Sequence, residues 1–146
     1  MGQKINIPTP VCFSTSRKVT ATDINYGGHA GNERFLLFAQ ETRIAFLSTL
    51  GFSETAFGPY GLILAEAHIE YLNELFDEEI LTIDLSITAP TRVAFECYYQ
   101  IKTSRAGKEI KAANIRTNMV CFDYTERKVK SIPEDIKQLL AAKSQG

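Results

Sequence analysis

Apolar and polar residues alternate along four segments between residues 65 and 121. The segments cover residues 65–71, 81–88, 93–102 and 113–121. An alternation with a period of two is typical of strands that cover one face and leave the other face open. A further strand is expected over residues 13–21, near the start of the chain. The pattern therefore predicts an antiparallel sheet with one apolar face.

A long helix is expected between the first strand and the other four, over residues 32–50, where Asn32 is a favourable N-cap and Glu33 complements the helix dipole. Apolar residues occupy two sides of this helix, one with Phe35, Phe38, Ala39, Phe46 and Leu50 and the other with Leu36, Leu37, Ile44 and Leu47. A helix that is apolar nearly all round is typically buried. A short terminal helix is expected over residues 132–140. We therefore expect an α+β fold in which the antiparallel sheet wraps around one long central helix.

Length and composition fit a globular protein. The 146 residues are 45% hydrophobic, and we expect a single domain over residues 1–146 with residues 1–10 as a loose arm. The 16 basic and 17 acidic residues nearly cancel, and no basic tract or zinc-binding spacing occurs, so neither a nucleic acid partner nor a metal is expected. The apolar runs are too short to cross a membrane. Three cysteines, odd in number and far apart, fit reduced thiols and a cytoplasmic location.

The loop before the long helix concentrates the polar groups that could perform chemistry. Residues 22–32 read Thr-Asp-Ile-Asn-Tyr-Gly-Gly-His-Ala-Gly-Asn. The N-terminus of a helix carries N–H groups without helical partners and a partial positive charge, so it can polarise a carbonyl group. A glycine turn followed by a capped helix would show the same residues. The residues alone leave both interpretations open.

The order of elements and several motifs resemble the hotdog-fold acyl-CoA thioesterases of the 4-hydroxybenzoyl-CoA thioesterase type. The motifs are D-x-(D/N)-x-x-G-H-x-x-N in the loop, Glu41-Thr-Arg43 in the helix, Gly51 after it, and Val-Cys-Phe-Asp at 120–123. The resemblance extends over residues 13–123. It implies a hotdog fold, hydrolysis of a thioester without a metal or another cofactor, and a homodimer or homotetramer whose sites lie where two subunits meet.

The loop departs from this family's pattern at Asn25, which stands where many members carry the catalytic aspartate. An asparagine can hold a water molecule or a carbonyl group, but it cannot take up a proton at neutral pH. Asp23 or Glu41 could supply the base instead. Glu41 has apolar neighbours on its helix face, which favour a general base, although it could also pair with Arg34 or Arg43. Asp23 could alternatively cap its own turn.

The remaining candidate residues surround the expected start of the helix. Backbone N–H groups of Gly31, Asn32 and Glu33 would form an oxyanion site for the thioester carbonyl. Gly28 would let the backbone approach the substrate closely. His29 could bind substrate or transfer a proton, or could be a structural residue held by hydrogen bonds. These residues complete the predicted site.

Together these features predict an acyl-CoA thioesterase that converts a small to medium acyl or aryl thioester to a free acid and CoA. One alternative is a hotdog enoyl-CoA hydratase, in which Asp23 and His29 would together activate one water molecule. Another is a protein that binds or senses acyl-CoA without catalysis, as Asn25 suggests. The sequence leaves open the acyl group and the choice between CoA and acyl carrier protein.

Overall fold

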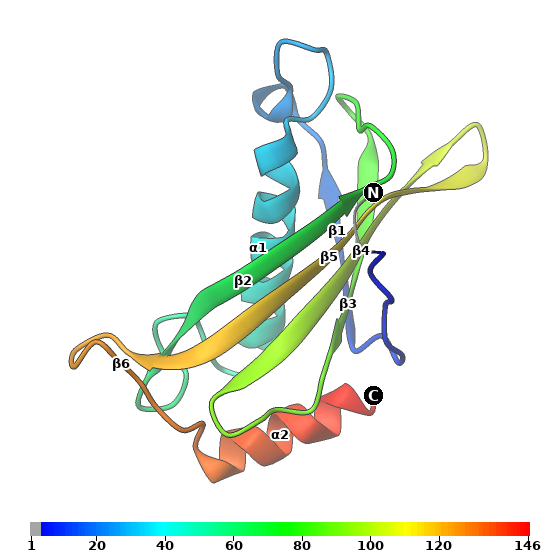
Figure 1. Ribbon diagram of the computed structural model, residues 1–146. Helices are drawn as coiled ribbons and strands as arrows, with labels where there is room; N and C mark the ends of the chain where they lie inside the picture. The colour runs from blue at the N-terminus through cyan, green and yellow to red at the C-terminus, as the bar shows by residue number, and fades with distance from the viewer. Residues whose placement is uncertain (1–3) are drawn as a thin grey trace.

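The chain folds into one antiparallel sheet and two α-helices, as seen in a computed structural model that describes residues 4–146 (Figure 1). The first three residues of the expected arm lie outside the described part. The elements follow one another as β1 (Phe13–Lys18), η1 (Ala21–Asp23), α1 (Asn32–Thr49), β2 (Gly61–Tyr71), β3 (Ile80–Ile87), β4 (Ala94–Arg105), β5 (Lys108–Asp123), β6 (Lys128–Val129) and α2 (Glu134–Ser144).

The sheet runs in the order β1-β3-β4-β5-β2, and the short β6 pairs with β5. All of its pairings are antiparallel. The long strands β4 and β5 form a hairpin in which Ala106 and Gly107 take positive φ angles of 51° and 76°. β2 lies at one edge of the sheet and carries a bulge between Leu64 and Glu66. The four strands expected from alternation and the further strand near the start of the chain are all present. β2, β4 and β5 are longer than expected, and β1 ends at Lys18.

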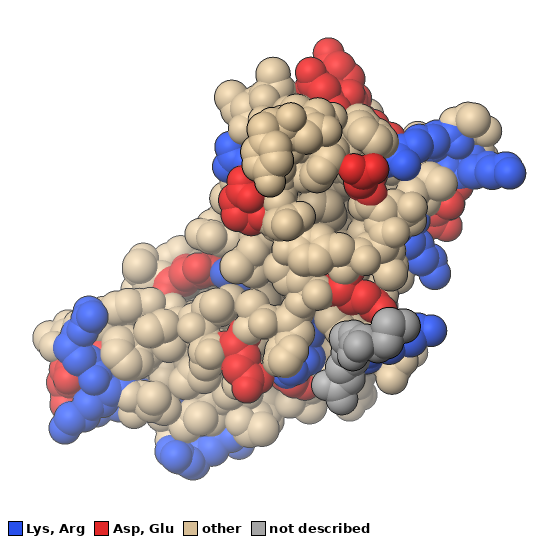
Figure 2. All heavy atoms as spheres, turned by 45° about the horizontal axis from the view of Figure 1, so that its top comes forward, with Lys and Arg blue, Asp and Glu red and all other residues tan. Residues whose placement is uncertain are grey.

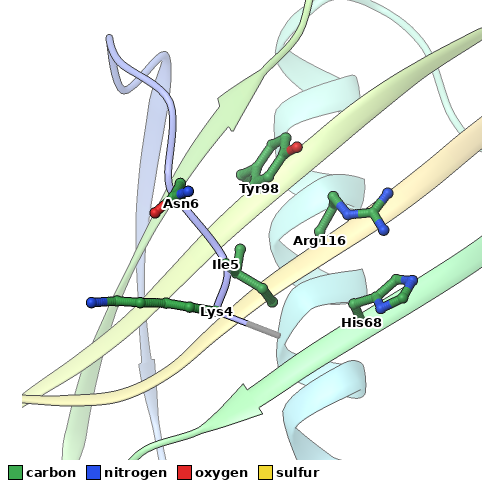
Figure 3. Close-up of a pocket in the computed structure, with 6 residues that line it drawn as sticks. All are labelled: Lys4, Ile5, Asn6, His68, Tyr98 and Arg116. Atoms are coloured by element: carbon green, nitrogen blue, oxygen red, sulfur yellow. The ribbon is translucent and has the colours of Figure 1, made fainter. Parts of the chain in front are cut away.

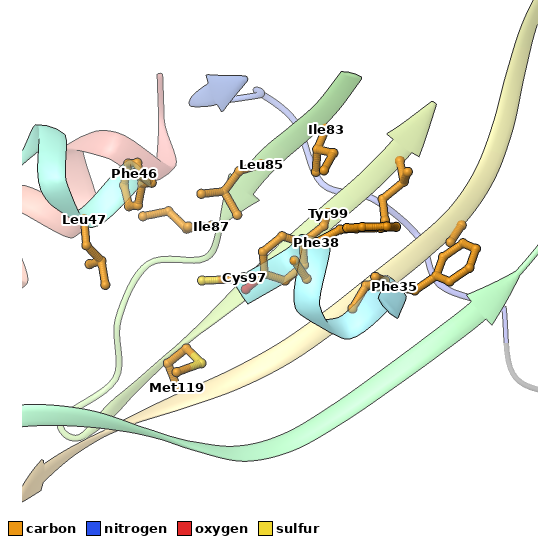
Figure 4. Packing of buried hydrophobic residues seen from close by; sticks show 14 of the residues in the cluster. Phe35, Phe38, Phe46, Leu47, Ile83, Leu85, Ile87, Cys97, Tyr99 and Met119 are labelled. Atoms are coloured by element: carbon orange, nitrogen blue, oxygen red, sulfur yellow. The ribbon is translucent and has the colours of Figure 1, made fainter. Parts of the chain in front are cut away.

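Helix α1 packs against the apolar face of the sheet, so the fold is the expected sheet around a central helix (Figure 1). Its aromatic residues meet the inward-facing side chains of β3, β4 and β5 (Figure 4). The inward residues are the ones that the alternation selects, among them Ile83, Leu85, Cys97, Tyr99, Ile115 and Met119, all at most 1% exposed. Burial raises the pKa of the Cys97 thiol to about 12, which keeps this thiol protonated.

The expectation that α1 is buried all round is wrong for the chain as described. Its buried residues lie on one side: Phe35, Phe38, Ala39, Thr42, Arg43, Phe46 and Leu47. Ile44 on the other side is 45% exposed, and Leu36 and Leu37 are only half-buried. A single curved sheet can cover only one side of a helix. The N-cap is also Gly31 rather than Asn32, which is the first helical residue.

A buried ion pair fixes α1 to the sheet. Arg43 is 3% exposed, and its guanidinium contacts the carboxylate of Glu54 and donates to Tyr99 Oη at 2.8 Å. Tyr99 Oη also lies 2.8 Å from the hydroxyl of Thr117 on β5. Burial raises the pKa of Tyr99 despite the nearby guanidinium, so Tyr99 remains a neutral phenol. Arg43 therefore belongs to the core, and the Glu41-Thr-Arg43 motif contributes an anchor for the helix.

Candidate active site

The loop between η1 and α1 is a tight turn held by its own backbone. Ile24 and Ala30 form an antiparallel bridge, and the Asn25 N–H donates to His29 O at 2.9 Å. The Asn25 side chain accepts a hydrogen bond from the Gly27 N–H at 2.9 Å. Gly28 has a φ of +79°, a conformation that L side chains rarely adopt. Gly28 is therefore explained by the shape of this turn.

The start of α1 leaves two backbone N–H groups without an acceptor. The Gly31 N–H donates to Asp23 O at 3.0 Å, and the Arg34 N–H donates to Gly31 O at 3.0 Å. Within residues 4–146, the N–H groups of Asn32 and Glu33 donate no hydrogen bond. Free amides and the positive end of the helix dipole together favour a negatively charged oxygen. Two of the three predicted oxyanion donors are thus available, while the third, Gly31, is occupied.

A cavity of about 240 Å³ lies at the first turn of α1, and Asn32 is among the residues that line it. It is bounded by the loop, the first turn of α1 and the end of β2, through His29, Ala30, Asn32, Phe35, Tyr71, Leu72, Asn73 and Glu74. Tyr71 packs edge-on against Phe35, with ring centroids 5.1 Å apart, and its hydroxyl donates to Asn32 O at 3.0 Å. The cavity therefore combines an aromatic wall with polar groups, as small-molecule sites commonly do.

Asp23 lies behind the loop, held by two arginines. Its carboxylate, 1% exposed, contacts the Arg17 guanidinium and lies 3.3 Å from Arg34 Nε. It also accepts a hydrogen bond from the Thr20 N–H at 2.9 Å. Burial opposes ionisation, but the hydrogen bonds from Arg17 and Thr20 outweigh it and hold the pKa of Asp23 below its usual range. A carboxylate so paired is a poor proton acceptor, and Asp23 is not among the residues that line the cavity.

Glu41 lies three turns along α1 and is also paired with an arginine. Its two carboxylate oxygens accept from Arg17 Nε at 3.0 Å and Nη2 at 3.3 Å. The two pairings that the sequence left open do not form in the described chain, because Arg34 binds Asp23 and Arg43 binds Glu54. Glu41 is likewise absent from the lining of the cavity. Its position therefore favours a link between α1 and β1.

His29 lines the cavity, and the side chain of Asn25, like that of His29, lies next to Gly27. A methyl group on Gly27 would lie 3.0 Å from His29 Nε2 and 3.3 Å from Asn25 Oδ1, so both side chains flank this glycine. His29 Nδ1 lies 3.0 Å from Ala30 O. His29 Nε2 lies 3.4 Å from Glu74 Oε2. The structure thus brings His29 to the cavity together with a carboxylate that sequence reasoning did not consider.

Glu74 belongs to the connection between β2 and β3, a segment that no sequence motif marks as part of the site. Its neighbours Tyr71 and Asn73 also line the cavity. The available signal was a cluster of polar residues directly after the 65–71 alternation, where a strand end can face a helix start. The contact between His29 and Glu74 could not be predicted from local patterns, because 45 positions separate the two residues in the sequence.

A second cavity, of about 270 Å³, lies on the face of the sheet opposite α1 (Figure 3). Lys4, Ile5, Asn6, His68, Tyr98 and Arg116 line it. Arg116 there pairs with Glu96 at 2.8 Å and with Glu66 at 3.5 Å, so its charge is already balanced. This cavity also lacks a helix N-terminus. The chemistry of thioester activation therefore favours the cavity at α1.

Figure 2 shows the molecule with the end that carries the loop before α1 turned forward. Acidic and basic side chains are interspersed there on a largely uncharged surface. No large area of one sign appears on this face. Among residues 4–146, no helix has the length and apolar character needed to span a membrane.

Similarity to known proteins fits this site. A 1,4-dihydroxy-2-naphthoyl-CoA thioesterase from Synechocystis is 25% identical, with a TM-score of 0.77 over 89% of this chain and 95% of that one. A 4-hydroxybenzoyl-CoA thioesterase with an aspartate-to-asparagine substitution, bound to 4-hydroxybenzoyl-CoA, is 13% identical, with a TM-score of 0.79 over 88% and 97%. A Staphylococcus aureus protein in complex with CoA is 18% identical, with a TM-score of 0.79 over 98% and 90%. No curated protein sequence matches the chain.

The fold and its solved neighbours define a hotdog-fold thioester hydrolase, as the resemblance implied. Residues 19–140 match the thioesterase-like superfamily. The chain belongs to this superfamily.

Proposed function

We propose that this thioester hydrolase is an acyl-CoA thioesterase, which converts a small to medium acyl or aryl thioester to a free acid and CoA. The observation that carries the proposal is the pair of free amides of Asn32 and Glu33 at the start of α1, where Asn32 lines the cavity. Two of the solved neighbours are described as thioesterases of aromatic acyl-CoA compounds, and another is bound to CoA. The aromatic wall formed by Phe35 and Tyr71 supports an aryl or short acyl group.

In the proposed reaction the thioester carbonyl oxygen lies against the N–H groups of Asn32 and Glu33. These donors stabilise the negative charge that develops when water attacks the carbonyl carbon. Asn25 and His29 orient the water and the thioester beside Gly27, and Gly28 shapes the turn that carries them. The backbone donors need no metal or other cofactor to polarise the carbonyl.

The proposal includes assembly into a homodimer or homotetramer. β2 is an edge strand, and its Ile63 and Leu64 are 37% and 38% exposed. An edge strand with exposed apolar residues is a template for pairing with another chain. The proposal also places the protein in the cytoplasm, which the three free thiols support.

The test measures the release of free CoA from a panel of short-chain, long-chain and aromatic acyl-CoA compounds. Chromatography detects the products, because a thiol reagent would also react with the protein's own cysteines. Turnover of short or aromatic compounds supports the proposal. Tight binding without turnover would point to the non-catalytic alternative. Hydration of an enoyl-CoA without hydrolysis would point to the hydratase, although Asp23 is engaged by Arg17 and Arg34 and does not contact His29 in the described chain.

The role of the helix amide can be tested separately with Asn32→Pro. Proline lacks the N–H group but is tolerated in the first helical position. The preceding Gly31 already has φ −65° and ψ 152°, the extended conformation that a following proline requires. Compared with Asn32→Ala, which keeps the N–H group, Asn32→Pro should lower kcat by about 10²–10³-fold. Equal kcat values for the two variants would contradict the oxyanion role of this amide.

A further inference from the structure

The proposed site lacks an obvious base. Asn25 carries an amide at the position where a carboxylate could act as the base. An amide cannot take a proton from water at neutral pH. Asp23 and Glu41 are both bound by Arg17 and lie outside the lining of the cavity. Hydrolysis still requires a group that accepts the proton of the attacking water.

Glu74 lines the cavity, and its backbone is held firmly in place. The Arg105 guanidinium donates to Glu74 O and also binds the carboxylate of Glu79. The next residue, Leu75, is fully buried, and its carbonyl accepts a hydrogen bond from the Ala30 N–H at 2.8 Å. Glu74 is therefore fixed from both sides, and one of these contacts ties it directly to the loop that carries His29.

The carboxylate of Glu74 differs from the other two in its partner. It contacts His29 Nε2 at 3.4 Å, and its side chain is 62% exposed. No arginine or lysine pairs with it among residues 4–146. Because His29 Nδ1 is within hydrogen-bond distance of Ala30 O, the imidazole ring is oriented with Nε2 toward Glu74. This carboxylate is thus positioned, reachable by water and part of the same cavity lining as Asn32.

We propose that Glu74 is the base of the reaction and that His29 is the positioning residue that orients its carboxylate; the inference rests on the proposed thioesterase function. A water O–H bond breaks and its proton passes to the Glu74 carboxylate, while the water oxygen bonds to the thioester carbon. The resulting oxyanion lies against the N–H groups of Asn32 and Glu33. The C–S bond then breaks, and the proton moves from Glu74 to the departing thiolate. The products are a carboxylic acid and CoA, with no other reactant.

Glu33 is the competing carboxylate, because it also lies at the start of α1. Its side chain lies next to Gly31, so that a methyl group on Gly31 would lie 2.5 Å from Glu33 Oε1. A carboxylate in this place compensates the helix dipole. It is not among the residues that line the cavity, whereas Glu74 is.

The experiment compares wild type, Glu74→Gln, Glu33→Gln and Asp77→Asn on the acyl-CoA that wild type hydrolyses best. Asp77→Asn is the matched control, since Asp77 is an exposed carboxylate in the same connection and outside the cavity. Glu74→Gln should lower kcat by about 10²–10⁴-fold with KM changed little, since an amide keeps the shape but accepts no proton. Asp77→Asn should keep wild-type kcat. His29→Ala should lower kcat by a smaller factor than Glu74→Gln.

A chemical rescue separates a base from a merely structural residue. In Glu74→Ala, added formate should restore part of the lost kcat, because a small carboxylate can occupy the vacated space and accept the proton. Loss of kcat in Glu33→Gln with full activity in Glu74→Gln would overturn the inference while leaving the thioesterase function intact. Absence of hydrolysis by wild type across the whole panel would overturn the proposed function itself.

Discussion

The carboxylates around the start of α1 fall into two groups with opposite surroundings. Behind the loop, Asp23 and Glu41 share Arg17, and Asp23 also lies beside Arg34. On the cavity side, Glu74 forms an ion pair with His29 and with no other residue among 4–146, and its side chain is 62% exposed. An acidic residue inside a motif can therefore stabilise the fold, while the carboxylate proposed as the base lies outside every motif. The arginine partners occupy the carboxylates behind the loop, whereas the carboxylate of Glu74 remains open to water.

The largest expected difference in stability between the two groups comes from Asp23→Asn. This change removes a carboxylate that is 1% exposed and leaves Arg17 and Arg34 without their partner. We expect the free energy of unfolding to fall by roughly 2–3 kcal/mol, somewhat less than for a fully buried pair because both arginines keep some contact with water. Urea denaturation of the two proteins measures this loss.

Glu74→Gln serves as the opposite case in the same denaturation experiment. Because Glu74 is largely exposed, its replacement should change the free energy of unfolding by no more than about 0.5 kcal/mol. If Glu74→Gln lowered the free energy of unfolding as much as Asp23→Asn does, the two groups of carboxylates would not differ in their contribution to stability.

The pH dependence of stability should also follow Asp23. Its pKa is lowered in the folded state, so its stabilising contribution is complete above the unfolded value of about 3.9 and is lost as pH falls through the folded value. The difference in unfolding free energy between wild type and Asp23→Asn should therefore be constant near neutral pH and shrink below about pH 4. Other carboxylates with lowered pKa, such as Asp84, are common to both proteins and cancel in the subtraction. A difference that stays constant down to pH 2 would contradict the ion-pair account.

The smallest expected effect on stability among the paired acids belongs to Glu41→Gln. Glu41 is 41% exposed, so water screens its pairing with Arg17. We expect a loss of about 0.2–1 kcal/mol in the free energy of unfolding. A loss near that of Asp23→Asn would mean that Glu41 carries more of the network than its exposure indicates.

The sequence predicts the fold well because its signals are local. Alternation identifies the strands, and the apolar helix identifies the layer that packs on them. The main failure is the expectation of a helix buried all round, and it has a physical reason. Apolar residues such as Ile44 show which sides of the helix avoid water, but not whether this chain or another one covers them. The expectation of a helix N-terminus with free amides also rests on local residues. The structure places the N-cap at Gly31, one residue earlier than expected, and leaves the N–H groups of Asn32 and Glu33 free among the described residues.

The candidate site was less predictable because its side chains meet through long-range contacts. Glu74 follows β2 in the sequence and contacts His29 because the end of β2 lies beside the start of α1. Asp23 contacts Arg17, which belongs to β1. Helical spacing suggested arginine partners for Glu41 on its own helix, but the partner comes from the neighbouring strand. Pairings between distant segments depend on strand register, which alternation alone does not define.

The most direct test of the whole account is the ratio of kcat between two identical substitutions, Glu41→Gln and Glu74→Gln, on the best acyl-CoA substrate. Both remove one charge from one glutamate, and both should leave the protein folded. The account predicts near wild-type kcat for Glu41→Gln and a value lower by about 10²-fold or more for Glu74→Gln. The reverse order would place the base on the central helix and contradict the assignment of Glu74.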